Sequence, residues 1–558
     1  MYGKEEIEFL RNKNYLRVDE TVSDRISDIV EVVRKYEHKY SEGLADRIKF
    51  LIENQIFSPS TPQLANMGRK NSKDLPVSCN IISYPNSIKG IFYSHGEAAM
   101  LSKLGAGVGA SFINLPSKGT EIEKGLFTNP KLDWAETFCD TTQKVSQSNK
   151  RRGYGVPFIS IDDDEFYNLM KRIDKRNPDK KDPFVENNVG IVLPLDFKER
   201  IKVDKELQKR FLKVLTERRA VGKIYIVELE NMNKNISPVY SALNHIVNTT
   251  NICTEVVSPS YDDKTFACVI GSINATKWDI LKDNLQYIRD CYMFLDIVVE
   301  EYIRLTDGVP FLEKARRSAI EKRDVGLGVL GFHEFLQMNE CSLGSLKSRA
   351  LNKEIFKTLR EQGEIVTKEM AEKLGAPKMC KEANLMRRNV SLMMVAPNKS
   401  TSFICGQTSP GIEPIRGNVL VKVLAGIQVV VKNKHLKSKL QELGKDTQEV
   451  WESITNNIGS VQHLDFLDKG TKAIFKTASE ISPKDIIDLA SDRQKYIDMS
   501  QSLNLFDRPN YTLKDIYDIH MYAFNKDIKT LYYYYSQAHS AFENVNGESW
   551  RTCESCED

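Results

Sequence analysis

Apolar residues in the first 56 positions recur at the spacing of an amphipathic helix, as Ile26, Ile29, Val32 and Val33 illustrate. The run from Phe57 to Pro62, which contains two prolines, interrupts this pattern and indicates a boundary. We therefore predict a short helical N-terminal region over residues 1–75.

Beyond this region, from about residue 76 to about 510, short apolar runs alternate with amphipathic helical stretches. The clearest runs are Val77–Ser83, Val189–Leu193, Lys223–Val227 and Val390–Val395. Strands that alternate with helices over such a length favour a large α/β domain, and a barrel in particular. We predict this domain over residues 76–540, with a small C-terminal α/β subdomain inside it. Residues 541–558 show no periodicity and are predicted to form a flexible tail.

Composition narrows the class of protein. Hydrophobic residues make up 41% of the chain and charged residues 28%, which is typical of a water-soluble globular protein. The net charge of +3 gives no indication that the chain binds nucleic acid or an anionic membrane. The first residues are charged, unlike a secretory signal, and no apolar stretch approaches the ~18 residues of a membrane span. We expect a cytoplasmic protein without nucleic-acid or membrane partners.

The ten cysteines are scattered through the chain, unlike the dense framework of a small secreted domain. In the cytoplasm they would stay reduced, so those with a function would act as reactive thiols. The eight histidines show no paired metal-ligand spacing, and we expect this chain to bind no metal or other cofactor itself.

One pentapeptide combines three reactive side chains. Asn251, Cys253 and Glu255 occupy alternate positions, and alternate side chains of an extended segment share one face. An amide, a thiol and a carboxylate could therefore meet at one substrate. Taken alone, the same residues also fit a loop with a buried cysteine.

This pentapeptide, Asn-Ile-Cys-Thr-Glu, resembles the finger-loop motif Asn-Leu-Cys-x-Glu of the ribonucleotide reductase large-subunit family, and the resemblance runs from about residue 57 to the C-terminus. It implies a ten-stranded α/β barrel with a central finger loop. It also implies that Cys253 carries a transient thiyl radical that removes the 3′ hydrogen of the ribose. Glu255 would then be the general base on the 3′ hydroxyl, and Asn251 would orient the substrate.

Further motifs follow in the order of that family. By this resemblance Cys79 and Cys268 form the redox pair that supplies two reducing equivalents as the 2′ hydroxyl leaves as water. The resulting disulfide must be reduced again by thiol exchange, and the tail dithiol Cys553 and Cys556 suits this step, with thioredoxin or glutaredoxin as external reductant. The alternative for the tail pair is half of a zinc knuckle.

The substrate-binding residues implied by the resemblance are Thr61, Ser78, Gly107, Lys399, Ser400 and Thr401. The last three open a predicted helix whose N-terminal N–H groups favour an anion such as the substrate phosphates. The glycine-rich run from Gly326 to Gly331 lacks the lysine of a Walker phosphate loop, and we interpret it as a helix-packing segment.

The run Lys-Thr-Leu-Tyr-Tyr that ends at Tyr533 indicates which class of ribonucleotide reductase the chain resembles. It resembles the class I sequence in which tyrosines pass a radical inward from a separate small subunit with a dinuclear metal centre, with Tyr533 outside and Tyr532 inside. Diphosphate substrates follow from this class. The alternatives are an adenosylcobalamin-dependent class II reductase, a glycyl-radical enzyme and a catalytically inactive scaffold. A cofactor that makes the radical in place needs no tyrosine relay.

Regulation departs from the family pattern. Asn86 and Pro116 stand where relatives commonly have an aspartate and an arginine, so the resemblance implies that ATP or dNTP effector binding would rely on Asn86 and on a rebuilt contact at Lys118. Thr61 lies close to the first residue, and we expect no N-terminal ATP cone. The expected partners are the small subunit, the external dithiol protein and a second copy of this chain in a homodimer.

Overall fold

The computed structural model describes residues 2–535 except positions 71, 73, 124–125, 146–152, 175–176, 178, 180 and 425–426. It begins with three helices, α1 (Lys4–Asn12), α2 (Val22–Tyr40) and α3 (Leu44–Glu53). The Thr21 hydroxyl caps α2 by accepting a hydrogen bond from the Asp24 N–H, which satisfies a free donor of the first turn. Apolar side chains such as Ile29 and Val33 bury the inner face of α2.

A seven-stranded sheet forms one half of the central domain. Its core is parallel and consists of β2 (Cys79–Ser83), β3 (Gly107–Ser111), β6 (Gly155–Ser160), β7 (Val189–Leu193) and β8 (Ile224–Glu228). Two short antiparallel strands close its edges: β11 (Phe266–Ala267) pairs with β2, and β17 (Thr530–Leu531) pairs with β8. The parallel strands are buried, as expected for strands covered on both faces.

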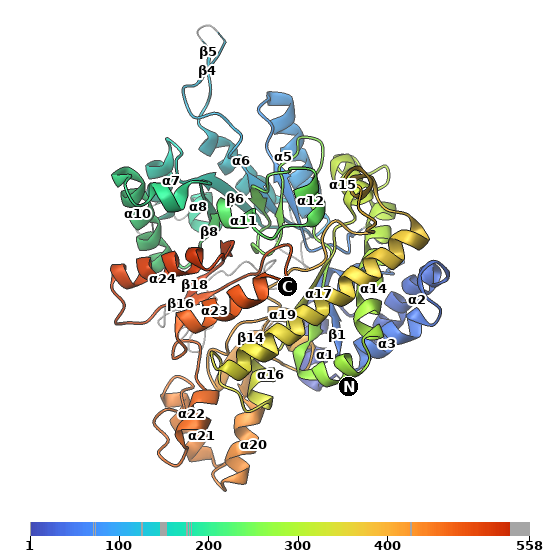
Figure 1. The fold of residues 1–558 in the computed structure, drawn as a ribbon, viewed down its shortest axis with the longest axis vertical. Coiled ribbons are helices and arrows are strands. Elements are labelled where there is room, and N and C mark those ends of the chain that lie inside the picture. The colour runs from blue at the N-terminus through green and yellow to red at the C-terminus, as the bar shows by residue number, and fades with distance from the viewer. Residues whose placement is uncertain are drawn as a thin grey trace.

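The other half is a three-stranded sheet of β1 (Phe57–Pro59), β12 (Ile270–Asn274) and β13 (Gly326–Leu330). Parallel bridges extend it from Leu327 to Met393 and from Val395 to Gln501. The two halves curl toward each other with helices outside them, and the expected α/β barrel is confirmed (Figure 1). The hairpin of β9 (Thr249–Thr250) and β10 (Val257–Ser258) carries the finger loop, and β9 packs against β2 and β3.

The glycine-rich run at 326–331 corrects one interpretation. It forms strand β13 and is not a helix-packing segment. A Cβ atom on Gly326 would overlap the Met394 side chain, so the glycine allows the strand and the segment at 393–395 to lie against each other.

A small subdomain has its own hydrophobic core. Its elements include β14 (Val419–Leu424), α20 (Lys434–Glu442), α21 (Gln448–Asn456) and α22 (Lys469–Ile474). The core is separate from that of the barrel and comprises Val419, Leu436, Leu440, Trp451, Ile454, Val461, Leu464, Leu467 and Phe475. The subdomain projects from the lower end of the molecule in Figure 1.

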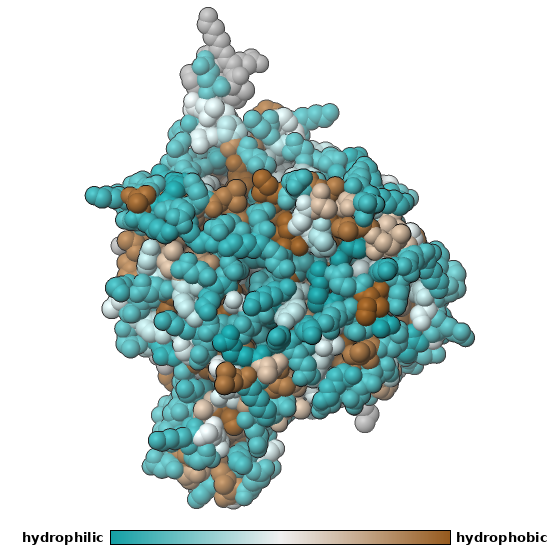
Figure 2. Space-filling view, in the orientation of Figure 1, coloured by the Kyte–Doolittle hydropathy of each residue, from teal (hydrophilic) through white to brown (hydrophobic). Residues whose placement is uncertain are grey.

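The surface in the view of Figure 2 is mostly hydrophilic, with apolar side chains in small separate groups. Among the helices of the described residues, none joins the length and the apolar character that crossing a bilayer requires.

Candidate active site

The finger loop holds its own conformation through Asn251. The Asn251 Oδ1 accepts a hydrogen bond from the Val256 N–H at 3.1 Å, and its Nδ2 donates to Glu255 Oε1 at 2.8 Å. A Cβ on Gly109 of β3 would lie 2.6 Å from the Thr250 carbonyl oxygen, so glycine is required where the loop crosses this strand. Cys253, at the tip, is only 5% exposed.

Two further thiols face the loop. Asn251 Nδ2 lies 3.0 Å from Cys79 Sγ, and the Cys268 N–H donates to the Cys79 carbonyl at 2.9 Å. The sulfur atoms of Cys79 and Cys268 and a carboxyl oxygen of Glu255 all lie within 4.8 Å of one another. A disulfide bond of about 2.05 Å therefore needs only a local movement of the two sulfurs. The Cys79 thiol, through a hydrogen bond, and burial both raise the pKa of the Cys268 thiol.

The Glu255 carboxyl is buried, and burial raises its pKa to about 7. Hydrogen bonds from Asn251 and Ser502 act in the opposite direction, because they stabilise the charged carboxylate. A pKa near neutrality suits a group that must accept a proton and then release it.

A cluster of tyrosine rings lies near Cys253. The ring centroids of Tyr532 and Tyr533 are 4.3 Å apart, and those of Tyr225 lie 4.7 Å and 5.3 Å from the same two rings. The Asn188 Nδ2 donates to the hydroxyls of Tyr225 and Tyr533, the second at 3.0 Å. Burial and the nearby Cys253 thiol raise the pKa of Tyr532 well above its usual value, so this phenol keeps its proton.

Of the expected substrate-binding residues, Thr61 begins α4 (Thr61–Asn66) and Ser78 directly precedes Cys79 of β2. Within the described part of the chain, the buried hydroxyls of Thr61 and Ser78 make no hydrogen bond. Such groups lose free energy unless a ligand or water contacts them. Gly107 pairs with Cys79 between β3 and β2, which places this glycine backbone beside the redox pair.

Helix α19 (Lys399–Ile404) contains the other three expected substrate-binding residues, Lys399, Ser400 and Thr401. Asn398 precedes it with a left-handed φ of 54°, and the Thr401 hydroxyl donates to Asn398 Oδ1 at 3.1 Å. Ser400 is buried in the same turn, and the Lys399 ammonium lies 5.7 Å from the centroid of the Tyr533 ring. Lys399 therefore places a positive charge beside the tyrosine cluster.

The regulatory candidates stand apart from these residues. Asn86 is exposed just before α5 (Ile88–Lys103), and Lys118 is exposed in the loop before β4 (Glu121–Glu123). The tail cysteines Cys553 and Cys556 lie outside the described residues. All eight cysteines that the structure describes are buried free thiols.

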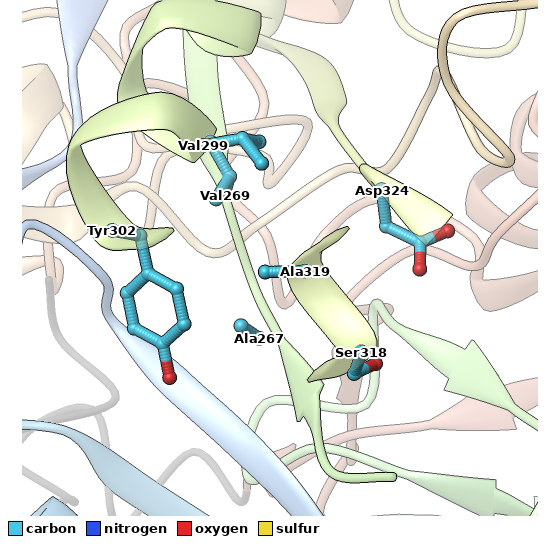
Figure 3. Close-up of a pocket in the computed structure, with 7 residues that line it drawn as sticks. All are labelled: Ala267, Val269, Val299, Tyr302, Ser318, Ala319 and Asp324. Carbon is cyan, nitrogen blue, oxygen red and sulfur yellow. The ribbon is translucent and has the colours of Figure 1, made fainter. Parts of the chain in front are cut away.

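A small pocket lies beside the short segment that links β11 to β12 and contains Cys268. Ala267 and Val269, its neighbours in sequence, line this pocket together with Tyr302 and Ala319 from the outer helices (Figure 3). Cys268, which lies between these two residues in the chain, is grouped instead with Cys79 and Glu255 in the active site. The pocket is therefore separate from the thiols.

Three residues of the site were not anticipated from the sequence: Tyr225 on β8, Asn188 before β7, and Ser502. Ser502 donates to the Cys253 carbonyl at 2.6 Å and lies 3.3 Å from Glu255 Oε2. The apolar alternation around Tyr225 marks a strand, but the contact with Tyr532 comes from the pairing of segments far apart in the chain.

Comparison with known proteins agrees with this geometry. The profile of the family "Ribonucleotide reductase, barrel domain" matches residues 77–210, 205–387 and 383–534. The ribonucleoside-diphosphate reductase large subunit of Invertebrate iridescent virus 3 is 30% identical over 89% of this chain and 88% of its own length. A putative large subunit from Frog virus 3 is 27% identical over 95% and 96%, respectively. The class Id ribonucleotide reductase alpha subunit of Actinobacillus ureae superposes with a TM-score of 0.88 at 33% identity, covering 96% of this chain and 97% of that one.

Proposed function

This chain belongs to the class I ribonucleotide reductase large-subunit family, and we propose that it reduces ribonucleoside diphosphates by radical chemistry on Cys253. The observation that carries the proposal is the convergence of the finger loop with Cys79 and Cys268 around one carboxylate, Glu255. An oxidoreductase that replaces a hydroxyl by hydrogen needs a hydrogen-atom acceptor, a base and a two-electron donor, and this site offers all three.

The proposed reaction begins with a thiyl radical on Cys253, which takes the hydrogen atom from C3′ of the ribose. Glu255 accepts the proton of the 3′ hydroxyl while the 2′ hydroxyl leaves as water with a proton from the thiol pair. Cys79 and Cys268 give two electrons and two protons in total and end as a disulfide. The hydrogen atom then returns from Cys253 to C3′ and Glu255 returns its proton to the 3′ oxygen, which restores both the thiyl radical and the base. The balance is one diphosphate and two thiols to one deoxyribonucleoside diphosphate, one disulfide and one water.

The radical is proposed to reach Cys253 through Tyr533 and then Tyr532 from a partner subunit that contains metal. The contact of the rings at 4.3 Å supports a short path, because transfer between phenols needs adjacent groups. The adenosylcobalamin-dependent reaction is not favoured, since the relatives that match nearly the whole chain are ribonucleoside-diphosphate reductase large subunits and a class Id alpha subunit. The dinuclear nature of the partner's metal centre remains a proposal from the class.

The substrate phosphates are proposed to bind between Thr61, Ser78 and the first turn of α19. The unpartnered buried hydroxyls of Thr61 and Ser78 support this placement. Ser400 and Thr401 would bind the phosphates with the N–H groups of this turn, and Lys399 would add a positive charge.

The partners are proposed to be a small subunit, thioredoxin or glutaredoxin, and a second copy of this chain. The exposed Ile88 and Phe92 on α5, 64% and 60% accessible, support a homodimer through this helix. Cys553 and Cys556 would return electrons to the redox pair. Effector nucleotides would bind near Asn86 and Lys118. Reduced thiols of this kind suit a cytoplasmic setting.

The test is CDP reduction by the purified chain with dithiothreitol and ATP, once with the small subunit from the same genome and once with adenosylcobalamin alone. We expect turnover only with the subunit. Turnover with cobalamin alone would overturn the radical path through the tyrosines. No turnover under either condition, with a folded chain and a small subunit that carries its metal, would overturn the proposed activity.

A further inference from the structure

The segment from Asp498 to Asn504 has no part in the reaction proposed above, yet it contacts the finger loop at Cys253 and Glu255. The Ser500 N–H donates to the Glu255 carbonyl at 2.8 Å, and the Ser502 hydroxyl donates to the Cys253 carbonyl at 2.6 Å. The Thr530 hydroxyl donates to the Thr254 carbonyl between them at 2.8 Å. Three successive carbonyls of the loop are therefore bound from one side.

The same segment also holds the tyrosine strand. The Tyr532 N–H donates to the Leu503 carbonyl at 2.9 Å, and the Tyr533 N–H donates to Asn504 Oδ1 at 3.0 Å. The consecutive residues Ser502 and Leu503 thus connect Cys253 to the proposed tyrosine relay, and they set the distance between the two. A displacement of these two residues would move the thiol and the phenols relative to each other.

Within the segment from Asp498 to Asn504, Ser502 is the residue whose side chain contacts the Glu255 carboxyl group. Its hydroxyl is buried, lies 3.3 Å from Glu255 Oε2 and faces the oxygen that Asn251 leaves free. We propose that Ser502 is a positioning residue that orients the Glu255 carboxylate and fixes the Cys253 backbone, so that base and sulfur meet the same edge of the ribose. This inference rests on the proposed function.

This role predicts a change in the acid limb of the pH profile, that is, in the low-pH range over which kcat rises as Glu255 loses its proton. The one hydrogen of the Ser502 hydroxyl is shared between the Cys253 carbonyl at 2.6 Å and Glu255 Oε2 at 3.3 Å in a bifurcated hydrogen bond. The part of this bond that reaches the carboxylate stabilises its ionised form, so removal of the hydroxyl raises the pKa of Glu255 above the value of about 7 set by burial. The other titratable groups that face Glu255 are the thiols of Cys79 and Cys268 from the barrel strands and of Cys253 from the loop itself. These thiols stay the same in all variants of Ser502.

The experiment compares Ser502→Ala and Ser502→Thr with the wild-type chain in CDP reduction with the small subunit, over pH 5.5 to 9. For Ser502→Ala we expect kcat to fall about tenfold, which corresponds to ~1.4 kcal/mol in the barrier, with KM within about twofold. We expect its acid limb to move upward by roughly half to one pH unit. Ser502→Thr keeps the hydroxyl and is expected to restore the wild-type limb.

Ser391→Ala is the matched control. The Ser391 hydroxyl is also buried and donates to a carboxylate, Asp324 Oδ1, at 2.8 Å, but it has no contact with the finger loop. Ser391→Ala measures how much activity is lost when a buried hydroxyl–carboxylate hydrogen bond is removed elsewhere in the chain. We expect the acid limb of this control to stay at the wild-type pH. If Ser502→Ala does not fold, Ser502→Cys, with its weaker donor, replaces it and is expected to shift the limb in the same direction.

Two results would overturn the inference. One is a kcat loss in Ser502→Ala with an unmoved acid limb, which a purely structural role would give. The other is a variant equal to wild type. Either leaves the proposed function standing if the wild-type chain reduces CDP, whereas an inactive wild-type chain would overturn both.

Discussion

Cys253 lies between two regions of different construction. On the relay side, three tyrosine rings contact one another, and the backbone N–H groups of Tyr532 and Tyr533 are hydrogen-bonded to the segment beside the finger loop. On the thiol side, Cys79 Sγ lies 3.0 Å from the Asn251 amide nitrogen and Cys268 Sγ lies 3.7 Å from the Met394 sulfur, and hydrogen bonds to sulfur are weak.

The difference agrees with the role proposed for each side. Transfer of a hydrogen atom or electron between phenols depends steeply on distance, so a relay works best when its groups are held in place. A redox pair must instead form and lose a covalent bond in each cycle, and strong hydrogen bonds to its sulfurs would oppose that movement. Rigid contacts on one side and weak contacts on the other therefore serve one reaction.

The largest expected effect is at the residue that the two regions share. Cys253→Ser should lower CDP reduction at least about 10⁴-fold, equivalent to ~5.5 kcal/mol, because a serine hydroxyl does not form the radical that abstracts the 3′ hydrogen. Tritium release from 3′-labelled CDP should vanish as well. Residual release in this variant would mean that another group abstracts the hydrogen.

On the relay side, Tyr532→Phe should reduce turnover with the small subunit at least about 10³-fold, since phenylalanine cannot lose an electron and a proton together. Tyr292→Phe is the matched control, because Tyr292 is equally buried and its hydroxyl donates to the Leu359 carbonyl, far along the chain from the relay. An active Tyr532→Phe enzyme would show that the radical does not pass through Tyr532, and the tyrosine cluster would then need another explanation.

On the thiol side, Cys268→Ser should separate the two halves of the reaction. Sustained turnover should fall about 10²-fold or more, because only one thiol remains to supply electrons. Abstraction of the 3′ hydrogen should persist and is measured by tritium release in the same assay. Loss of this release would show that Cys268 is needed before the reduction step.

The pH dependence tests the carboxylate between the regions. Burial raises the pKa of Glu255 to about 7, and the base is the ionised form, so activity should increase as the pH rises through that value. The ionised fraction grows from roughly one tenth at pH 6 to roughly nine tenths at pH 8, which predicts about a ninefold rise in kcat. Circular dichroism over the same range verifies that the fold persists. A kcat that does not change between these pH values would exclude this role.

The smallest effect is expected at Tyr225. Tyr225→Phe keeps the ring contacts but removes the hydroxyl that Asn188 binds, and kcat should fall about threefold, or ~0.6 kcal/mol. A loss as large as that of Tyr532→Phe would make Tyr225 a member of the relay and would change the path through the cluster.

The sequence predicted those parts of the molecule that carry a local signal. The apolar run Val189–Leu193 coincides with β7, and the run Lys223–Val227 is displaced by one residue from β8. The finger-loop residues Asn251 and Glu255 do meet through their side chains, but the expected extended segment was wrong. The loop turns instead, with Thr254 at a left-handed φ of 64°, and this turn brings the two side chains together.

Other features arise only when distant segments meet. Nothing near Asn188 or Ser502 in the sequence indicates a contact with Tyr533 or Glu255, because these contacts join segments hundreds of positions apart. The glycines at 326–331 were misinterpreted for a related reason, since the bulk of Met394 against Gly326 is a tertiary feature. Hydrophobic pattern fixes elements, whereas the partners of a buried polar side chain depend on the complete fold.

The pairing of β17 with β8 has a consequence for the synthesis of the chain. Val227 and Thr530 are register partners, yet roughly 300 residues separate them, which a ribosome adds in about 15 to 60 seconds. Throughout this time the growing chain presents β8 with an open edge, which is a surface for aggregation and for chaperones. The strand that finally covers this edge leads directly into Tyr532 and Tyr533. A nascent chain that stops early thus lacks both the cover of its barrel and the relay, so incomplete products neither mature nor carry a radical.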